Sequence, residues 1–431
     1  MKNSSNLAKD LINKRFLIYG LGETGKSVIR FFRRKKICRY YVWDDFTIEK
    51  KYFNKRFDGD FNKIDFIVVS PGVKIENTPF NLELKKNKKK IISDLDLFYI
   101  FNPKTITIGV TGTNGKSTTC RLIFEILKKN NFNVKIGGNI GDPILNISCN
   151  KKSIVVIEMS SFQLAYSKFI RPNHSIFLNL SLDHIDWHKS FHNYKKSKFR
   201  IFLNQQKKDF AYFKSNSLIK FFKNEKFKSK IVKIRENFHS NLKKIIKNDY
   251  LIFKPNIENL SFAYEIAKNF NISQKRVLNS LKNFKGLSHR YEIFLKKKNF
   301  VFINDSKATS FKSTSYSLEA NKNIYWIVGG LPKTGDKIKI DNLRKNLVKT
   351  YIIGKNTSFF SKQFNKKKIN YIICNKLKSA IIKIFNDIKD NKQKCVILFS
   401  PASASYDQYK NFEDRGESFK NLIKYYAKRY I

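Results

Sequence analysis

A glycine-rich turn that opens a helix is the feature that most restricts the fold of this chain. A strand is predicted at 105–110, a helix at 119–129, and the turn between them reads Gly109-Val110-Thr111-Gly112-Thr113-Asn114-Gly115-Lys116-Ser117-Thr118. Backbone N–H groups at such a turn converge on an anion, the lysine reaches the outer phosphates, and the hydroxyl serves Mg²⁺. Val110 stands where the strict pattern has glycine, so the match is to a variant loop. We expect it to bind ATP; the alternative is an ordinary strand-to-helix turn.

A second glycine-rich turn lies near the N-terminus. The predicted strand 16–19 runs into Gly20-Leu21-Gly22-Glu23-Thr24-Gly25, a helix follows at 26–34, and the next strand, 40–43, ends in Asp44-Asp45. This arrangement is typical of dinucleotide-binding units, in which a helix N-terminus attracts a phosphate and an acid accepts from a ribose or base. A nucleotide, a nucleotide-sugar or NAD(P) fits the pattern, and so does a turn without a ligand. Ser70-Pro71-Gly72, after the strand 66–69, is expected at the same sheet edge.

Short apolar runs alternate with helical patterns along the whole chain. This rhythm predicts an α/β protein with parallel sheets. A third and weaker strand-then-glycine opening occurs where the apolar run 325–328 meets Gly329-Gly330. We place domain boundaries near residues 103 and 286, giving domains 1–103, 104–286 and 287–431. The lysine-rich stretch 213–247 is assigned to the middle domain.

The strong positive charge does not by itself identify a partner. The 431 residues include 86 Lys and Arg against 34 Asp and Glu, a formal net charge of +52. Such a charge is typical of proteins that bind nucleic acid or anionic membranes. The lysines are spread evenly among many Asn, Ile, Phe and Tyr, however, and all of these residues have AT-rich codons. We therefore favour a biased composition with a solvated basic surface, and expect no nucleic-acid or membrane partner.

The cysteines and the N-terminus point to a reducing compartment. The five cysteines are far apart and form no CxxC pair, which argues against a disulfide framework or a zinc site. No signal-like apolar segment begins the chain, and no run approaches the about 18 apolar residues of a membrane helix. We expect a cytoplasmic protein, and a monomer.

Acidic and basic side chains follow predicted strands beside the phosphate loop. Glu158 ends the strand 154–157, and Asp183-His184 comes after the strand 176–178. Carboxylates at strand ends next to a phosphate loop are suited to Mg²⁺, which prefers oxygen ligands. Taken alone, His184 is better explained as a hydrogen-bonding or structural residue, and Lys198 as one more solvated lysine.

Several motifs together resemble the Mur ligases, and among them the branch that adds D-glutamate to UDP-N-acetylmuramoyl-L-alanine. The similar segments span nearly the full chain and come in the family's order. They are the loop 109–118, Gly137-Gly138-Asn139-Ile140-Gly141, Glu158-Met159-Ser160-Ser161-Phe162-Gln163-Leu164, Asp183-His184-Ile185-Asp186, His289-Arg290-Tyr291-Glu292, Asn304-Asp305-Ser306-Lys307-Ala308-Thr309-Ser310, and Ser400-Pro401-Ala402-Ser403-Ala404-Ser405-Tyr406-Asp407-Gln408-Tyr409-Lys410-Asn411-Phe412-Glu413-Asp414-Arg415-Gly416.

The resemblance implies three domains: an N-terminal Rossmann-like domain that binds UDP, a central P-loop ATPase-type domain, and a C-terminal Rossmann-like domain that closes over the site. The first turn then binds a UDP-sugar in place of NAD. The implied residues for this substrate are Leu21, Gly22, Glu23, Thr24, Asp44, Ser70, Asn139 and Ser160. The implied residues for ATP are Gly112, Thr113, Asn114, Gly115, Lys116, Ser117, Thr118, Asn256, Asn259, Arg290 and Asp305, although Pro255 stands where the family usually has His beside that asparagine pair.

The resemblance also implies an ADP-forming ligase reaction. The L-alanyl carboxylate attacks the γ-phosphate of ATP, and the amine of D-glutamate then attacks the acyl phosphate. Two Mg²⁺ ions are implied, with Ser117, Glu158, His184 and Lys198 as ligands, and Lys198 aligns with a family lysine that CO₂ converts to a carbamate. Lys116, His184 and Lys198 are the implied catalytic residues. The residues implied for D-glutamate are Lys307, Thr309, Lys333, Ser405 and Phe412.

Three alternatives remain open from the sequence. One is a neighbouring amide ligase, either another Mur ligase or folylpolyglutamate synthase, which share the ATP loop but not the DSKAT segment or the segment 400–416. A second is a basic nucleic-acid-binding ATPase, whose binding should depend steeply on salt. The third is a homologue that has lost or changed its activity.

Overall fold

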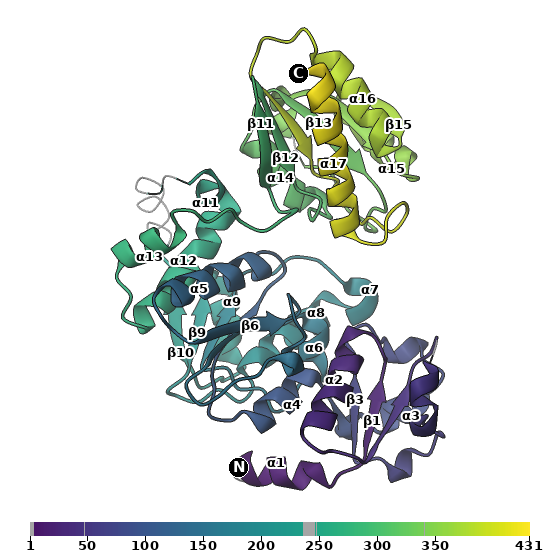
Figure 1. The fold of residues 1–431 in the computed structure, drawn as a ribbon, viewed down its shortest axis with the longest axis vertical. Coiled ribbons are helices and arrows are strands. Elements are labelled where there is room, and N and C mark those ends of the chain that lie inside the picture. The colour runs from purple at the N-terminus through teal and green to yellow at the C-terminus, as the bar shows by residue number, and fades with distance from the viewer. Residues whose placement is uncertain (1–3, 47, 236–245, 247, 340) are drawn as a thin grey trace. The chain divides into compact units, whose positions relative to one another are not determined.

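The computed structural model describes residues 4–46, 48–235, 246, 248–339 and 341–431. Helices and strands alternate along the chain (Figure 1) and build three sheets. The chain divides into two compact units, one of residues 1–245 with 258–282 and the other of 246–257 with 283–431. The first unit contains two parallel sheets and the second a mixed sheet. The predicted α/β class is therefore confirmed.

The N-terminal sheet has the order β2-β1-β3-β4 and all its strands are parallel. Three of its strands occupy the predicted residues, because each is a short apolar run bounded by turn residues. The strands are β1 (Phe16–Tyr19), β2 (Tyr40–Trp43), β3 (Phe66–Val69) and β4 (Ile91–Ile92). The helices are α1 (Ser4–Ile12), α2 (Glu23–Arg34), α3 (Asn81–Lys86) and α4 (Asp94–Phe101), with short 3-10 turns at Lys50–Lys55, Phe61–Lys63, Ile75–Asn77 and Lys88–Lys90.

The central sheet is also parallel, with the order β10-β9-β8-β5-β7-β6. Its strands are β5 (Ile106–Thr111), β6 (Val134–Gly138), β7 (Ile154–Glu158), β8 (His174–Phe177), β9 (Phe210–Phe213) and β10 (Lys230–Lys233). The helices are α5 (Lys116–Lys129), α6 (Ser161–Tyr166), α7 (Ile185–His188), α8 (Phe191–Phe199), α9 (Asn216–Asn224), α12 (Lys254–Asn269) and α13 (Gln274–Leu281), with 3-10 turns at Ile144–Asn146 and Arg200–Phe202. Within the lysine-rich stretch 213–247, residues 236–245 and 247 lie outside the described residues.

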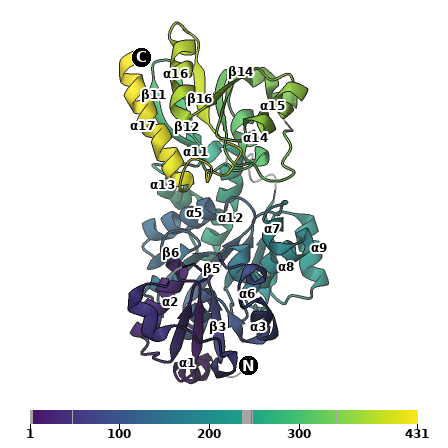
Figure 2. The same ribbon diagram turned by 90° about the vertical axis from the view of Figure 1, so that its right-hand side faces the viewer.

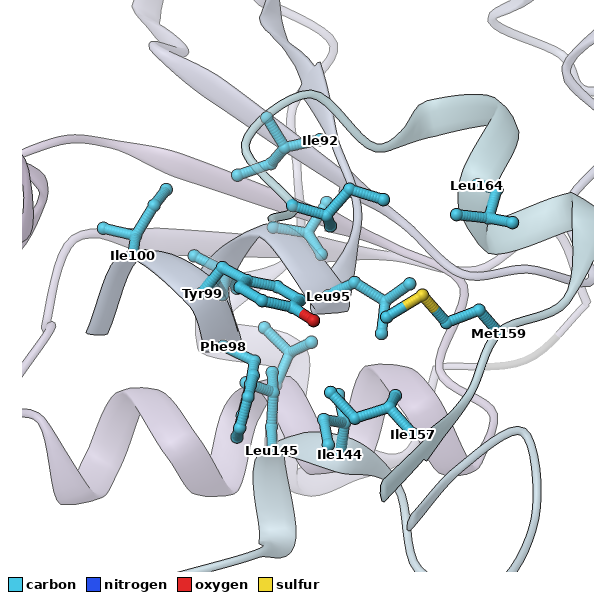
Figure 3. Packing of buried hydrophobic residues seen from close by; sticks show 14 of the residues in the cluster. Ile92, Leu95, Phe98, Tyr99, Ile100, Ile144, Leu145, Ile157, Met159 and Leu164 are labelled. Carbon is cyan, nitrogen blue, oxygen red and sulfur yellow. The ribbon is translucent and has the colours of Figure 1, made fainter. Parts of the chain in front are cut away.

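Helix α4 joins the two parallel sheets into one unit. Leu95 and Phe98 on this helix pack with Ile144, Leu145 and Ile157 of the central part (Figure 3). Polar contacts reinforce the junction, because an oxygen of Asp96 accepts from the backbone N–H groups of residues 168 and 169 at 2.8 and 2.6 Å. The helix follows the N-terminal sheet in sequence but is packed against the central domain as well. The boundary near residue 103 stays a prediction.

The second unit contains a sheet of order β11-β12-β16-β13-β14-β15, antiparallel between its first two strands and parallel elsewhere. Its strands are β11 (Glu292–Lys297), β12 (Phe300–Asn304), β13 (Ile324–Gly329), β14 (Leu347–Ile353), β15 (Tyr371–Asn375) and β16 (Cys395–Phe399). Its helices are α11 (Asp249–Ile252), α14 (Phe311–Glu319), α15 (Thr357–Lys366), α16 (Leu377–Ile388) and α17 (Phe412–Tyr430), with a 3-10 turn at Asp341–Asn346. Helices α16 and α17 cover one face of the sheet, and α14 and α15 cover the other (Figure 2).

Among the described residues, no helix combines the length and the apolar character needed to cross a membrane.

His174 makes the stability of the central sheet depend on pH. Its buried ring stacks on Phe210 at 5.3 Å, its Nδ1 lies 2.8 Å from the hydroxyl of Tyr212, and burial lowers its pKa to about 4. Below about pH 6.5 His174 becomes protonated in the unfolded chain but stays neutral in the folded chain. The free energy of unfolding therefore falls by about 2 kcal/mol between about pH 7 and about pH 5. We expect His174→Phe to lose less thermal stability on that acidification than the wild type; equal losses in thermal unfolding experiments would contradict this.

Candidate active site

The phosphate loop lies between β5 and α5, as predicted, at the carboxyl edge of the central sheet. Gly115 caps α5 with φ of +86°, a left-handed conformation that favours glycine, and a side chain there would collide with the amide of Asn259. Gly112 has φ of +149°, and a Cβ there would lie 3.0 Å from the Cβ of Leu178. No side chain makes a capping hydrogen bond at this start of α5, which favours binding of an anion by its backbone N–H groups.

Asn179, which follows β8, fixes the conformation of this loop. Its Oδ1 accepts from the N–H of Asn114 at 2.9 Å, its Nδ2 donates to the carbonyl of the same residue at 3.1 Å, and its own carbonyl accepts from the N–H of Thr113 at 3.0 Å. The hydroxyl of Thr113 also lies 3.0 Å from that of Tyr194. No sequence pattern indicated a functional role for Asn179 or Tyr194, since their pairing with the loop is visible only in three dimensions.

Two lysine ammonium groups converge on one carbonyl of the loop. Nζ of Lys116 donates to the carbonyls of Gly112 and Thr113 at 3.0 and 2.9 Å, and Nζ of Lys198 donates to the carbonyl of Gly112 at 2.7 Å. Ser117 and Thr118 are buried in the first turn of α5. A loop whose backbone and side chains present this much positive charge is suited to a polyphosphate.

Lys198 is buried, with 1% of its surface exposed, so it is not one more solvated lysine. Burial is the main cause that holds the pKa of its amine well below the usual range, and the nearby charge of Lys116 acts in the same direction. Glu158 and Asp183 oppose this shift. Its ammonium also lies 4.7 Å from the centre of the Tyr194 ring. The amine therefore spends more time in its neutral, nucleophilic form than an exposed lysine does.

Glu158 is the last residue of β7 and is 2% exposed. Its Oε1 accepts from Nδ2 of Asn139 at 2.8 Å. Its Oε2 is buried and has no hydrogen-bond partner in the described part of the chain. A buried carboxylate oxygen without a partner costs free energy, which a cation at this position would offset.

A chain of hydrogen bonds orients Ser160 at the start of α6. Oε1 of Gln163 lies 3.2 Å from the N–H and 3.1 Å from the hydroxyl of Ser160, and Nε2 of Gln163 donates to both carboxyl oxygens of Asp94 at 3.2 Å. Burial raises the pKa of Asp94 to about 6. The N-terminal helix α4, which begins at Asp94, is therefore connected to the predicted substrate residue Ser160.

His184 starts α7 in a left-handed conformation, with φ of 54°. Its Nε2 lies 3.5 Å from Oδ2 of Asp183, and its ring meets the edge of Phe162 at 4.8 Å between centroids. The side chain is 44% exposed, so it can contact a ligand. Among the described residues, no three His, Cys, Asp or Glu side chains cluster as a ready metal site.

The first glycine-rich turn is closed by hydrogen bonds from both neighbouring strands. Oδ2 of Asp44 accepts from the N–H of Leu21 at 2.6 Å, and the hydroxyl of Ser70 donates to the carbonyl of Gly20 at 2.7 Å. Gly22 caps α2, and Glu23 and Thr24 form its first turn. The residues predicted for UDP are thus brought to one edge of the N-terminal sheet. One oxygen of Asp44 supports the turn itself, a function that the sequence did not indicate.

In the second unit, loops after β12, β13 and β16 meet at the carboxyl edge of the sheet. Leu331 and Ala404 exchange two backbone hydrogen bonds of 2.9 Å, which brings the loop of Lys333 beside the loop of Ser405. Nζ of Lys307 lies 3.6 Å from the centre of the Phe412 ring. Thr309 lies in the loop after β12, just before α14. Four of the residues predicted for D-glutamate therefore occupy neighbouring loops, and the fifth, Phe412, begins α17 beside Lys307.

Arg415, for which the sequence indicated no role, holds these loops together. Its guanidinium is 1% exposed and donates to the carbonyls of Ser306, Ser403 and Ala404 at 2.8, 2.9 and 3.2 Å. Asp305 is also occupied within the unit: its oxygens accept from the hydroxyls of Ser317 and Ser400 and from the N–H of residue 291, and burial raises its pKa to about 6.

The remaining residues predicted for ATP lie in both units. Asn259 packs beside Gly115 in the first unit. Asn256 and Arg290 belong to the second unit, where Nδ2 of Asn256 donates to the carbonyl of Tyr250 at 2.8 Å. Asn256 is therefore already engaged in supporting the chain around α11.

Known proteins share both the sequence and the fold. A family model described as the Mur ligase middle domain matches residues 110–275. Proteins named UDP-N-acetylmuramoylalanine--D-glutamate ligase from Rickettsia felis and from Francisella tularensis subsp. holarctica are each 33% identical to this chain; the matches cover 94% of this chain and 96% of the first relative, and 95% of this chain and 95% of the second. The crystal structure of MurF ligase from Thermotoga maritima in complex with ADP has a similar fold, with a TM-score of 0.57, 14% identity, and coverage of 97% of this chain and 99% of that one.

Proposed function

We propose catalytic and binding roles for the residues of this chain, which belongs to the Mur ligase family and, within it, to the UDP-N-acetylmuramoylalanine--D-glutamate ligases. It is an ATP-dependent ligase that adds D-glutamate in the synthesis of peptidoglycan precursors. One observation supports these proposed roles most directly. Lys116 and Lys198 both donate to the carbonyl of Gly112, in the loop that precedes α5. Lys116 is placed to receive phosphate, and the side chain of Lys198 lies beside it at the same carbonyl, next to the phosphate loop.

The phosphates of ATP are proposed to bind along the loop 112–118. The ammonium of Lys116, which now contacts two loop carbonyls, exchanges them for the outer phosphates, because it is attracted more strongly to a charged phosphate oxygen than to a neutral carbonyl. Asn259, beside Gly115, is proposed to contact the adenosine part. Arg290, Asp305 and Asn256 stay predictions for this nucleotide, and the bonds that Asp305 and Asn256 already make favour supporting roles for them.

Glu158 and Ser117 are proposed to hold Mg²⁺. The unpaired Oε2 of Glu158 fits this role, since it is a buried anionic oxygen at the end of a strand beside the loop. When bound, the ion would neutralise charge on the transferred phosphoryl group. Asn139 holds the other carboxylate oxygen and so orients the ligand. A second ion is proposed near His184 and Lys198.

Lys198 is proposed to carry a carbamate. Its lone pair attacks the carbon of CO₂, a C–N bond forms, and one proton leaves to solvent, which converts the amine into an anionic group. The lowered pKa of the buried amine favours the neutral form that this step requires. Mg²⁺ prefers oxygen ligands, and the nitrogen of Lys198 already bonds to the carbonyl of Gly112, so its role as a ligand depends on this modification.

The reaction is proposed to proceed through an acyl phosphate. The L-alanyl carboxylate of UDP-N-acetylmuramoyl-L-alanine attacks the γ-phosphorus, and ADP leaves. Lys116 and the loop N–H groups stabilise the charge that develops on the transferred group. The neutral amine of D-glutamate then attacks the acyl carbon, the carbon–oxygen bond to phosphate breaks, and the nitrogen loses one proton as the amide forms. His184, which is partly exposed beside Asp183, is proposed to assist this second step.

Hydroxylamine tests the acyl phosphate directly. Without D-glutamate, the enzyme, ATP, Mg²⁺ and UDP-N-acetylmuramoyl-L-alanine should convert hydroxylamine into the hydroxamate of the L-alanyl group, because hydroxylamine displaces phosphate from an acyl phosphate. Mass spectrometry would detect this product. An enzyme that forms the D-glutamyl amide but never the hydroxamate would contradict the acyl phosphate.

The UDP-sugar is proposed to bind at the carboxyl edge of the N-terminal sheet. Leu21, Gly22, Glu23, Thr24, Asp44 and Ser70 form this edge. Asn139 and Ser160 are proposed to contact the sugar and the L-alanyl group. The connection from Asp94 through Gln163 to Ser160 supports this assignment, since it ties helix α4 to the side chain that meets the substrate.

D-glutamate is proposed to bind to Lys307, Thr309, Lys333, Ser405 and Phe412. A dicarboxylate needs cations and hydroxyls, and these loops provide both at one sheet edge. Arg415 keeps the loops in register through its bonds to three carbonyls.

Lys333→Ala tests this assignment. We expect the KM for D-glutamate to rise by about tenfold or more, since a charge-assisted hydrogen bond contributes about 1.5–3 kcal/mol, while the KM for ATP changes by less than about threefold. Lys337→Ala, an exposed lysine four positions along the same loop, is the matched control. Equal increases in both KM values would count against the assignment.

We further propose that the chain works as a monomer in the cytoplasm, where ATP is supplied, with small molecules as its partners. Nucleic acid has no place in this proposal, and the net charge of +52 is attributed to composition.

A further inference from the structure

His188 is a buried side chain at the end of α7 that contacts α6 and α8. Each of these three helices lies at a residue with a proposed binding or catalytic role. His188 ends α7 and is 4% exposed. Its Nε2 lies 3.0 Å from the hydroxyl of Ser161, the first residue of α6, and its Nδ1 lies 3.4 Å from the hydroxyl of Ser197 on α8. The backbone N–H of His188 donates to the backbone carbonyl of His184 at 3.0 Å.

Each of these contacts is one residue or one helical turn from a proposed functional group. Ser161 follows Ser160, Ser197 precedes Lys198, and His184 begins the turn that His188 ends. The ring is also fixed in orientation, because it stacks on Phe162 with an interplanar angle of 6° and a centroid separation of 5.7 Å. Because the His188 ring is held on all these sides, a shift of α6, α7 or α8 would displace the ring and with it the other two helices.

The chemistry of imidazole suits this place. Burial lowers the pKa of His188 to about 4, so the ring is neutral at neutral pH. A neutral imidazole has one donor and one acceptor nitrogen, and a serine hydroxyl can fill either role, so both serines can be bonded in either tautomer. No phenylalanine or leucine of similar volume can bond either hydroxyl.

We propose that His188 is a positioning residue, which fixes α6, α7 and α8 so that Ser160, His184 and Lys198 stay at their working separations. This inference rests on the roles proposed above for those three residues. It predicts that loss of the imidazole nitrogens lowers the rate of the bound complex more than the affinity for substrates, because small displacements of reacting groups are most costly in the transition state.

The experiment compares His188→Phe with His174→Phe in the full-length chain at about pH 8, where both histidines are neutral. Both residues are buried histidines of the central domain, with pKa values lowered to about 4, but His174 lies at the opposite, amino end of its strand. We expect His188→Phe to lower kcat by about tenfold or more with the KM for ATP within about twofold, while His174→Phe keeps kcat within about twofold.

Two further variants separate positioning from folding. His188→Gln, whose amide can reach Ser161, should restore kcat to within about threefold of the wild type. Ser161→Ala should lower kcat as His188→Phe does, and the double variant should be no slower than the slower single variant. Should His188→Phe fail to fold, Ser161→Ala and His188→Gln still decide the matter.

Three results would overturn the proposal. The first is a kcat within about twofold of the wild type in both Ser161→Ala and His188→Phe. The second is a double variant whose fold-decrease in kcat is the product of the two single decreases, and the third is an equal decrease in kcat in His188→Phe and His174→Phe. The wild type is measured first for phosphate release that depends on D-glutamate. Absence of that release would refute the function itself, whereas a normal wild type with a normal Ser161→Ala would refute the positioning role alone.

Discussion

Replacing Lys198 by alanine should lower turnover by about a thousandfold or more, the largest effect that we expect in this chain. The substitution removes a buried amine that donates to the carbonyl of Gly112 and that is proposed to become an anionic ligand through CO₂. Added bicarbonate should not restore activity, because alanine has no amine to modify. Phosphate release at saturating substrates measures the effect.

Lys196→Ala provides the control for this prediction. Lys196 lies on the same helix, α8, and its side chain is exposed. Its removal takes a lysine from the same helix without touching the phosphate loop, and it should leave turnover within about twofold. Full activity in Lys198→Ala would refute both the carbamate and the catalytic role of Lys198. Equal decreases in turnover in Lys198→Ala and Lys196→Ala would indicate that the positive charge of the helix matters, and not the specific side chain.

Glu158→Gln should produce opposite effects on activity and on stability. The amide has the same shape and keeps an oxygen that can accept from Asn139, but it replaces the unpaired, buried anionic oxygen. We expect kcat to fall by about a hundredfold or more and the Mg²⁺ requirement to rise, because one proposed ligand is lost. The melting temperature should stay constant or rise, since a buried carboxylate oxygen without a hydrogen-bond partner is removed.

The two readouts together distinguish the metal role from a structural one. Glu265→Gln, on α12, removes a carboxylate that pairs with Lys268 on the surface, and it should change neither kcat nor the Mg²⁺ requirement. A Glu158→Gln enzyme with normal kcat and normal Mg²⁺ dependence would contradict the metal site. A large loss of thermal stability would show that the carboxylate supports the fold.

Local signals predicted the phosphate loop and the strands around it. Glycine, lysine and hydroxyl residues at fixed spacing determine the backbone conformation of a few neighbouring residues. The loop can therefore be predicted without knowledge of the rest of the chain. The helix begins at Lys116, earlier than the predicted residue 119, because Gly115 caps it in a left-handed conformation. Glu158 likewise proved to be the last residue of its strand, where it pairs with Val110 of β5.

Long-range contacts account for what the sequence did not reveal. Lys198 stands among other lysines, and its burial is set by the packing of α8, which no local pattern records. Asn179 binds a loop residue 65 positions earlier, and Arg415 binds a carbonyl 109 positions earlier. The polar atoms were visible in the sequence, but their partners were not.

Helix α4 shows a signal that was present and not used. Its sequence, Asp94–Phe101, is apolar on nearly every face and buried throughout most of its length. A helix that is apolar all round is enclosed by protein on several sides, so its packing against both parallel sheets could have been expected. The predicted boundary near residue 103 relied on Asn102-Pro103. This dipeptide indicates where helix α4 ends, but it does not indicate which sheets the helix packs against.

The measurement that tests the central claim most directly is phosphate release with ATP, Mg²⁺ and UDP-N-acetylmuramoyl-L-alanine, with D-glutamate, with L-glutamate, and with neither. Release that depends on the D isomer, with the D-glutamyl amide as product, is the predicted result. A folded protein that binds ATP but releases no more phosphate with D-glutamate than with L-glutamate would contradict the account.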